Sequence, residues 1–148
     1  MKIYLASSWK NEKLVFIVAE FFRYRGHEVD AFVDTSTGRY SFHWTEMLSS
    51  SDKSKSELNA ITFLDDKRSQ KAFREDKKWL DWCDVCILIL PSGRSAHLEA
   101  GYAKGQGKVL VIYSHMEFPP GEFDVMYGFA DLLSIDLEEI EEFFNKEK

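Results

Sequence analysis

The fold is decided by one stretch of the chain, Val85-Cys-Ile-Leu-Ile-Leu-Pro-Ser-Gly-Arg-Ser95. Its first six residues are apolar without interruption, which is typical of a strand in the middle of a parallel sheet, where both faces are buried. A turn of small and polar residues follows, and a helical pattern continues from about Ser95 to Lys104. A buried strand that leads through a short turn into a helix is the unit from which α/β folds are built.

Similar units stand on both sides of this stretch. Short apolar segments predict four more strands, at residues 2–6, 29–33, 109–113 and 132–135. Helical spacing predicts a helix between the first two strands and others at residues 67–82, 122–130 and 137–144. The alternation predicts a single α/β domain over residues 1–148, with a flavodoxin-like or Rossmann-like, doubly wound sheet of five parallel strands. Residues 34–59 fit neither pattern and predict a long loop, of the kind that often forms a lid.

Composition and charge narrow the class of protein. The chain has 148 residues, 45% of them hydrophobic and 30% charged, so it is long enough to bury a core without disulfides or metals. Its net charge of -6 disfavours binding to long nucleic acid, although a small phosphorylated ligand still suits a local positive pocket. No apolar run reaches the ~18 residues of a membrane helix, and no signal-peptide pattern opens the chain. We therefore expect a cytoplasmic protein without a membrane partner.

Two turns at the carboxyl ends of strands are candidates for binding an anion. In a doubly wound sheet, ligands bind beyond these ends, where the strand order reverses. The candidates are Ser7, Ser8 and Trp9 after the first strand, and Gly93, Arg94 and Ser95 after the third. Free N–H groups at a helix start, hydroxyl donors and one guanidinium together suit a phosphate group. The alternative is that these residues only cap helices.

Two carboxylates stand on helix faces where apolar side chains are expected. Glu99 shares a helical stripe with the small side chains Ala96, Ala100 and Ala103. Asp76 interrupts the apolar face of the preceding helix, which is made of Ala72, Phe73, Leu80 and Cys83. Carboxylates are rarely buried unless they are paired or used, so we expect both to face the ligand crevice. For Glu99 the alternative is a favourable interaction with the positive end of its helix.

A pair of carboxylates with apolar neighbours suits the chemistry of a glycosidic bond. One attacks an oxocarbenium-like carbon, and the other handles the proton of the leaving group with the help of a raised pKa. This chemistry requires no metal and no redox cofactor. Cys83 and Cys86 have the spacing of redox and zinc motifs, but they stand at a helix end and lack further ligands at matching spacing. We interpret them as buried thiols.

Three segments carry a resemblance to a known family, residues 1–8, 73–85 and 90–108. In the third, a turn with glycine and serine precedes the pattern Glu-X-Gly-X-Ala, which begins at Glu99. The segments resemble the nucleoside 2-deoxyribosyltransferase-like family, which includes the nucleoside 5'-monophosphate N-glycosidases. The resemblance implies that Glu99 attacks C1' of the sugar and that Asp76 assists the leaving base. It also implies that the two turns bind the sugar or its phosphate.

The sequence departs from the pattern of this family at two places. The turn after the first strand reads Ser7-Ser8-Trp9, where the family often has a tyrosine. No aspartate stands shortly before Glu99, where the transferases commonly have one, and the place is taken by Arg94 and its neighbouring serines. This exchange favours a phosphate at the turn, and hence a nucleotide substrate. In the long loop, Phe42 and Trp44 are candidates for stacking on a base, with the packing of a lid as the alternative.

The sequence therefore predicts an enzyme that cleaves the N-glycosidic bond of a nucleoside or nucleoside 5'-monophosphate, with transfer to water or to another base. Two alternatives stay open. One is a non-catalytic nucleotide-sensing module on the same fold. The other is a phosphoribohydrolase-like enzyme, because residues 91–95 loosely resemble the glycine-rich turn of such enzymes. Members of the family that the chain resembles form dimers or larger rings. Because Trp79, Trp82 and Tyr102 exceed what one core is expected to hold, we also predict a homodimer or larger homo-oligomer.

Overall fold

Five parallel strands form one sheet at the centre of the computed structural model, which describes residues 1–43, 45–47, 59–118 and 120–146. The strands are β1 (Lys2–Ala6), β2 (Glu28–Ala31), β3 (Val85–Leu90), β4 (Val109–Ser114) and β5 (Leu132–Ser134). Their order across the sheet is β2-β1-β3-β4-β5, so the order reverses between β1 and β3. The predicted single α/β domain with a flavodoxin-like, five-stranded parallel sheet is confirmed.

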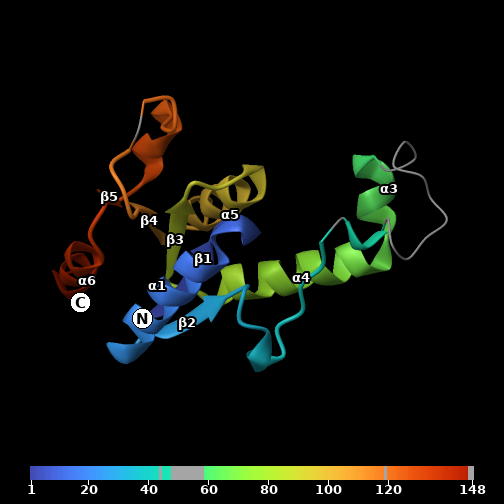
Figure 1. Ribbon diagram of the computed structural model, residues 1–148, viewed down its shortest axis with the longest axis horizontal. Helices are drawn as coiled ribbons and strands as arrows, with labels where there is room; N and C mark the ends of the chain where they lie inside the picture. The colour runs from blue at the N-terminus through green and yellow to red at the C-terminus, as the bar shows by residue number, and fades with distance from the viewer. Residues whose placement is uncertain (44, 48–58, 119, 147–148) are drawn as a thin grey trace.

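Helices cover both faces of the sheet (Figure 1). One face is covered by α1 (Glu12–Tyr24) and α6 (Leu137–Lys146), and the other by α4 (Lys67–Trp82) and α5 (Arg94–Gly105). The short 3-10 helices are η1 (Trp9–Asn11), η2 (Thr35–Thr37) and η3 (Val125–Phe129). In Figure 1, α4 extends beyond the sheet and α3 (Ala60–Asp65) lies at its far end. None of the described helices has the length and apolar character that crossing a bilayer requires.

The strands send alternate side chains into two separate cores. In β1, Ile3 and Leu5 pack toward α1 and α6, whereas Tyr4 and Ala6 face α4 and α5. The strand β3 is buried at all six positions, as its unbroken apolar run predicts. On the second face, α5 contributes the small buried side chains Ala96, Ala100 and Ala103. These small side chains let α5 approach the sheet closely, and they fix which of its sides faces inward.

The helix α3 is an element that the sequence analysis did not predict. Its start is marked by Asn59, whose side-chain oxygen accepts hydrogen bonds from the backbone N–H groups of Ile61 and Thr62. In return, the backbone N–H of Asn59 donates to the hydroxyl of Thr62. This capping box is visible in the sequence as Asn-X-X-Thr. The helix has only six residues, however, which is too short for a helical period to be recognised.

Three aromatic side chains of α4 do not lie where the sequence analysis expected them. Trp79 and Trp82 pack against the second core and contact each other edge to face, with ring centroids 5.2 Å apart. They are therefore half-buried against the core and not spare surface aromatics. Phe73, expected on the apolar face, has 64% of its surface exposed. Ala72 and Asp76 face inward on this helix, and Phe73 lies about 100° further round and points away.

Candidate active site

A pocket of about 660 Å³ lies at the carboxyl ends of β1 and β3, where the strand order reverses. This volume is ordinary for a small-molecule site. The predicted site residues among those that line it are Ser7, Ser8, Trp9, Phe42, Asp76, Gly93, Arg94, Ser95 and Glu99. Trp44, the remaining candidate, lies outside the described residues. The structure thus gathers in one pocket all predicted site residues that it describes.

Glu99 lies on the inner side of α5, between the buried residues Ala96 and Ala100. The Tyr4 side chain lies beside its carboxylate in the same pocket. Burial, together with the nearby negative charge of Asp76, raises the pKa of Glu99 to about 8, although Tyr4 opposes the rise. In the free protein at neutral pH, Glu99 therefore holds a proton.

Tyr4 is a site residue that the sequence analysis did not single out. Its side chain is buried in the second core, and it also lines the pocket. The feature of the sequence that could have identified Tyr4 is its position in β1, two residues before Ala6, which places both side chains on the same face of the sheet. A buried tyrosine hydroxyl requires a polar neighbour, and here that neighbour is Glu99, whose pKa Tyr4 lowers. A tyrosine is thus present at the site although the turn after β1 has none.

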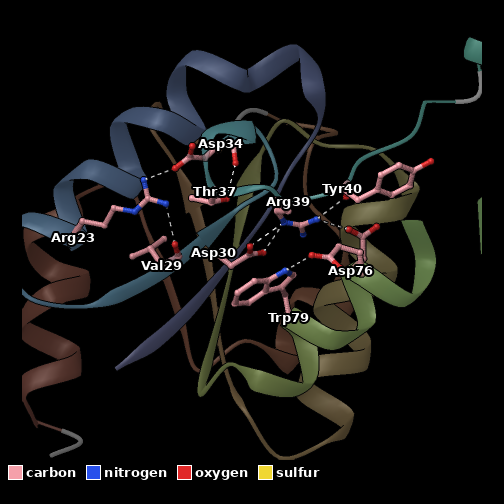
Figure 2. Close-up of polar contacts among 10 residues, drawn as sticks. Arg23, Val29, Asp30, Asp34, Thr37, Arg39, Tyr40, Asp76 and Trp79 are labelled. Atoms are coloured by element: carbon pink, nitrogen blue, oxygen red, sulfur yellow. Dashed lines mark hydrogen bonds and ion pairs between the residues drawn. The ribbon is translucent and has the colours of Figure 1, made fainter. Parts of the chain in front are cut away.

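Asp76 belongs to a largely buried ion-pair network (Figure 2). Arg39 Nη1 lies 3.0 Å from Asp76 Oδ1, and Arg39 Nε donates to the two carboxylate oxygens of Asp30 at 2.9 and 3.1 Å. The side chains of Arg39 and Asp30 are 1% and 5% exposed, whereas that of Asp76 is 38% exposed. Burial raises the pKa of Asp76, and the guanidinium of Arg39 opposes this rise. Asp76 therefore lines the pocket while one of its oxygens is engaged by Arg39.

The pair Asp30 and Arg39 was also missed from the sequence. Arg39 stands in the segment after β2, which the sequence analysis interpreted as part of a loop. The available signal was Asp30, a carboxylate between Val29 and Ala31 in a strand of a sheet covered on both faces. Such a carboxylate requires a partner. The sequence does not say which of the 19 lysines and arginines supplies it.

The turn before α5 presents backbone donors to the pocket. Gly93 is the N-cap residue, and it has no side chain that could accept a hydrogen bond from the N–H groups of the first turn. Arg94 and Ser95, the first two residues of α5, are exposed and line the pocket. Uncapped N–H groups beside a guanidinium and a hydroxyl make a suitable site for an anion.

The turn after β1 differs from the expectation. The Ser7 hydroxyl donates to the carbonyl of Ile89 at 2.9 Å and accepts from the side-chain amide of Asn11 at 3.2 Å. The Ser8 hydroxyl accepts from the backbone N–H of Lys10 at 3.3 Å. The turn opens the 3-10 helix η1 with Ser8 as its N-cap, as the capping alternative predicts, and α1 begins only at Glu12. Ser7 joins the turn after β1 to the end of β3, and its hydroxyl is engaged both as a donor and as an acceptor.

Aromatic side chains line one side of the pocket. Phe42 lies nearly parallel to Phe63, with 6.1 Å between the ring centroids, and the guanidinium of Arg68 lies 4.9 Å from the Phe42 ring. Trp9 contacts Phe32 edge to face, with ring centroids 5.0 Å apart. Flat ring faces suit stacking on a nucleobase. The contact of Phe42 with Phe63 is also what the packing of a lid predicts, so both interpretations of Phe42 stay open.

The two cysteines are buried in the second core, which confirms their interpretation as buried thiols. Burial raises the pKa of Cys83 to about 11 and that of Cys86 well above its usual value. Both are therefore protonated at neutral pH and poor nucleophiles. Within the described ranges, no group of three or more His, Cys, Asp or Glu side chains is arranged to hold a metal ion.

Comparison with solved structures bears on the fold. A 2-deoxyribosyltransferase from Bacillus psychrosaccharolyticus matches with a TM-score of 0.66 and 18% sequence identity, over 95% of this chain and 90% of that chain. The chain shares its fold with this transferase. The resemblance inferred from the sequence is thus confirmed at the level of the fold.

Two further structures match over nearly the whole chain. One is the CMP N-glycosidase BcmB of Clostridium botulinum, with a TM-score of 0.50, 14% identity and 100% of both chains covered. The other is the response regulator TrrA of Thermotoga maritima, with a TM-score of 0.51, 14% identity and coverage of 99% and 98%. No protein-family model and no curated protein matches the sequence. Because enzymes and a response regulator share this fold, function has to be argued from the site.

Proposed function

We propose that this protein is an enzyme that cleaves the N-glycosidic bond of a nucleoside 5'-monophosphate or, less efficiently, of a nucleoside. The observation that carries the proposal is the placement of Glu99 and Asp76 in one pocket at the switch point of the sheet. The charge of Asp76 contributes to the raised pKa of Glu99, so the two carboxyl groups act on each other. A module that only binds phosphate gains nothing from two carboxyl groups beside its ligand.

The proposed reaction requires one carboxylate and one proton. The Glu99 carboxylate attacks the anomeric carbon, the new C–O bond forms as the C–N bond breaks, and the electron pair of that bond leaves with the base. The base receives a proton from Asp76. In the free protein this proton resides on Glu99, whose pKa is about 8, so it moves to Asp76 before the attack. Water or a second base then releases the sugar from Glu99, and Asp76 takes up the proton of the attacking group.

The decisive experiment is to incubate the protein with a panel of nucleosides and their 5'-monophosphates, with and without an acceptor base. We expect free base to be released by the parent and no turnover by Glu99→Gln. Glu142→Gln serves as the control, because Glu142 is an exposed carboxylate on α6, away from the pocket. Full activity of Glu99→Gln would remove the nucleophile assignment. Tight binding by the parent without any turnover would favour the nucleotide-sensing alternative.

The role proposed for Asp76 predicts a dependence on the leaving group. Asp76→Asn should lower the rate about 10²–10⁴-fold, the usual range for a lost general acid. The loss should be smaller for substrates whose base leaves readily, since these depend less on protonation. Measuring kcat over a series of bases of graded basicity tests this expectation. An equal loss on every base would indicate that Asp76 only maintains the structure of the pocket.

The preference for a 5'-monophosphate is proposed to depend on Arg94. Arg94 stands at the start of α5, where the N-cap Gly93 offers no side-chain acceptor, and Arg94 and Lys10 both line the pocket. A charge-assisted contact of about 1.5–3 kcal/mol corresponds to roughly 10–150-fold in affinity. Arg94→Ala should lose most of that factor for the monophosphate and little for the nucleoside. Calorimetric titration of both ligands against parent and variant measures this, and equal affinities in the parent would contradict it.

A further inference from the structure

We propose that Arg39 is a positioning residue that fixes the Asp76 carboxylate in the pocket and holds a positive charge against it. The kinetic part of this inference rests on the proposed function. The electrostatic part concerns Asp76 itself and is measurable on the protein without substrate.

The contacts run in series from the edge of the sheet to the pocket (Figure 2). Asp30, in the edge strand β2, holds the Nε of Arg39 with both carboxylate oxygens. The Nη1 of the same guanidinium donates to Asp76 in α4 at 3.0 Å and to the carbonyl of Tyr40 at 3.5 Å. Because Asp30 and Arg39 are buried, the guanidinium has little freedom to move. Asp76 is therefore held from its protein side, and its accessible surface faces the pocket.

Stability alone does not account for a buried arginine in this arrangement. The Nη2 of Arg39 is buried and has no hydrogen-bond partner in the part of the chain that the structure describes. A buried donor without a partner costs stability, and buried ion pairs contribute little to it in any case. A role at the pocket would explain why this costly arrangement is present. The pocket residue that Arg39 contacts is Asp76.

Lys10, His43 and Arg94 also line the pocket that Asp76 faces, whereas the groups besides Arg39 that are coupled electrostatically to Asp76 are acidic. They are Glu75 on the same helix, Glu99 on α5, Asp30 on β2 and Tyr4 on β1. Within this set, Arg39 supplies the positive charge that lowers the pKa of Asp76 against the effect of burial. Without Arg39, the pKa of Asp76 would rise further, and Asp76 would be a poorer acceptor for the proton of Glu99.

Two substitutions of Arg39 separate charge from geometry. Arg39→Gln removes the positive charge. Arg39→Lys keeps the charge, but a lysine ammonium cannot bind Asp30 and Asp76 at the same time in the forked geometry of a guanidinium. The matched control is Arg23→Gln. Arg23 likewise binds a carboxylate and a backbone carbonyl, those of Asp34 and Val29, but it does not contact Asp76 (Figure 2).

The experiment follows the Asp76 carboxyl carbon by NMR through a pH titration of each variant, and measures kcat and KM over the same pH range. In Arg39→Gln, the titration midpoint of Asp76 should rise by about one pH unit or more, and the acidic limb of kcat/KM should move with it. Arg39→Lys should show a smaller rise and a kcat about 10–100-fold below the parent, with KM little changed. Arg23→Gln should leave both readouts unchanged.

An unchanged Asp76 midpoint in folded Arg39→Gln overturns the inference. Should that variant fail to fold, a parent-like midpoint and kcat in Arg39→Lys overturn it equally. If the midpoint shifts while the parent cleaves no nucleoside or nucleotide, the electrostatic role of Arg39 stands and the proposed function fails. The two claims are therefore decided separately.

Discussion

The proton on Glu99 links the chemistry of this residue to the stability of the protein. Its pKa is about 8 when folded and about 4.5 when unfolded, so the folded chain binds the proton more tightly. The contribution of Glu99 to the free energy of unfolding should therefore fall as pH rises from about 4.5 to about 8 and change no further above that range. Glu99→Gln carries no charge at any pH, so it should be more stable than the parent at pH 8.5, by about 1–4 kcal/mol, and similar to it near pH 4.5. Thermal melts at both pH values test this, with Glu142→Gln as control; a destabilised Glu99→Gln at pH 8.5 would mean that a partner keeps Glu99 ionised.

The same residue sets one limit of the proposed activity. Turnover requires the pair Glu99 and Asp76 to hold one proton, so kcat/KM should follow a bell-shaped curve against pH. The alkaline limb should lie near pH 8, where the second proton is lost and none remains for the leaving base. Initial rates on a monophosphate over a broad pH range measure both limbs. Constant activity well above pH 9 would contradict the requirement for a shared proton.

At the scale of elements, the placement of Asp76 depends on how α4 ends. The Nζ of Lys108 donates to the carbonyls of Leu80, Asp81 and Cys83 at 2.6, 2.7 and 2.7 Å, where the last carbonyls of the helix lack helical partners. Lys108→Met leaves these carbonyls without that donor and should lower the free energy of unfolding by about 1–3 kcal/mol. Denaturant unfolding measures the loss, and Lys13→Met, at an exposed position of α1, is the control. Equal losses in both variants would show that Lys108 contributes no more than a surface lysine.

For the whole molecule we predict self-association, although two of the three aromatics first offered as a reason, Trp79 and Trp82, are half-buried against the second core. Exposed apolar side chains gather instead between β4 and β5, at Phe123, Val125, Met126 and Phe129. A local cluster of this kind is typical of an interaction surface. We expect a dimer or larger assembly by light scattering and a smaller mass for Val125→Asp. Tyr24→Asp on α1 is the control, because Tyr24 and Val125 are both 91% exposed. A monomeric parent at working concentration would contradict the prediction.

Sequence patterns predicted the parts of this molecule that repeat over many residues. The bounds of α4 and β3 and the inward stripe of α5 follow from apolar periodicity, which reports directly on which side of an element is buried. Glu99 and Asp76 were found because they interrupt such stripes. Arg39 and Tyr4 were missed because their roles depend on partners brought close by the fold, and Arg39 stands 37 positions before Asp76 in a segment without a period. Long-range pairing of polar side chains leaves no local signal in one sequence.

The hydrogen bond from Ser7 to the carbonyl of Ile89 spans 82 positions of the chain, and so does the one from the backbone N–H of Lys2 to Asp84. On the ribosome, β1 and β2 are complete long before β3 exists. At about 5–20 residues per second, synthesis from the end of β2 at Ala31 to the end of β3 at Leu90 takes on the order of 3–12 s. The second edge of β1 has no neighbouring strand during that time. During that interval it is an open template for a strand of another nascent chain. The yield of folded protein should therefore depend on translation speed and chaperone access between these two strands.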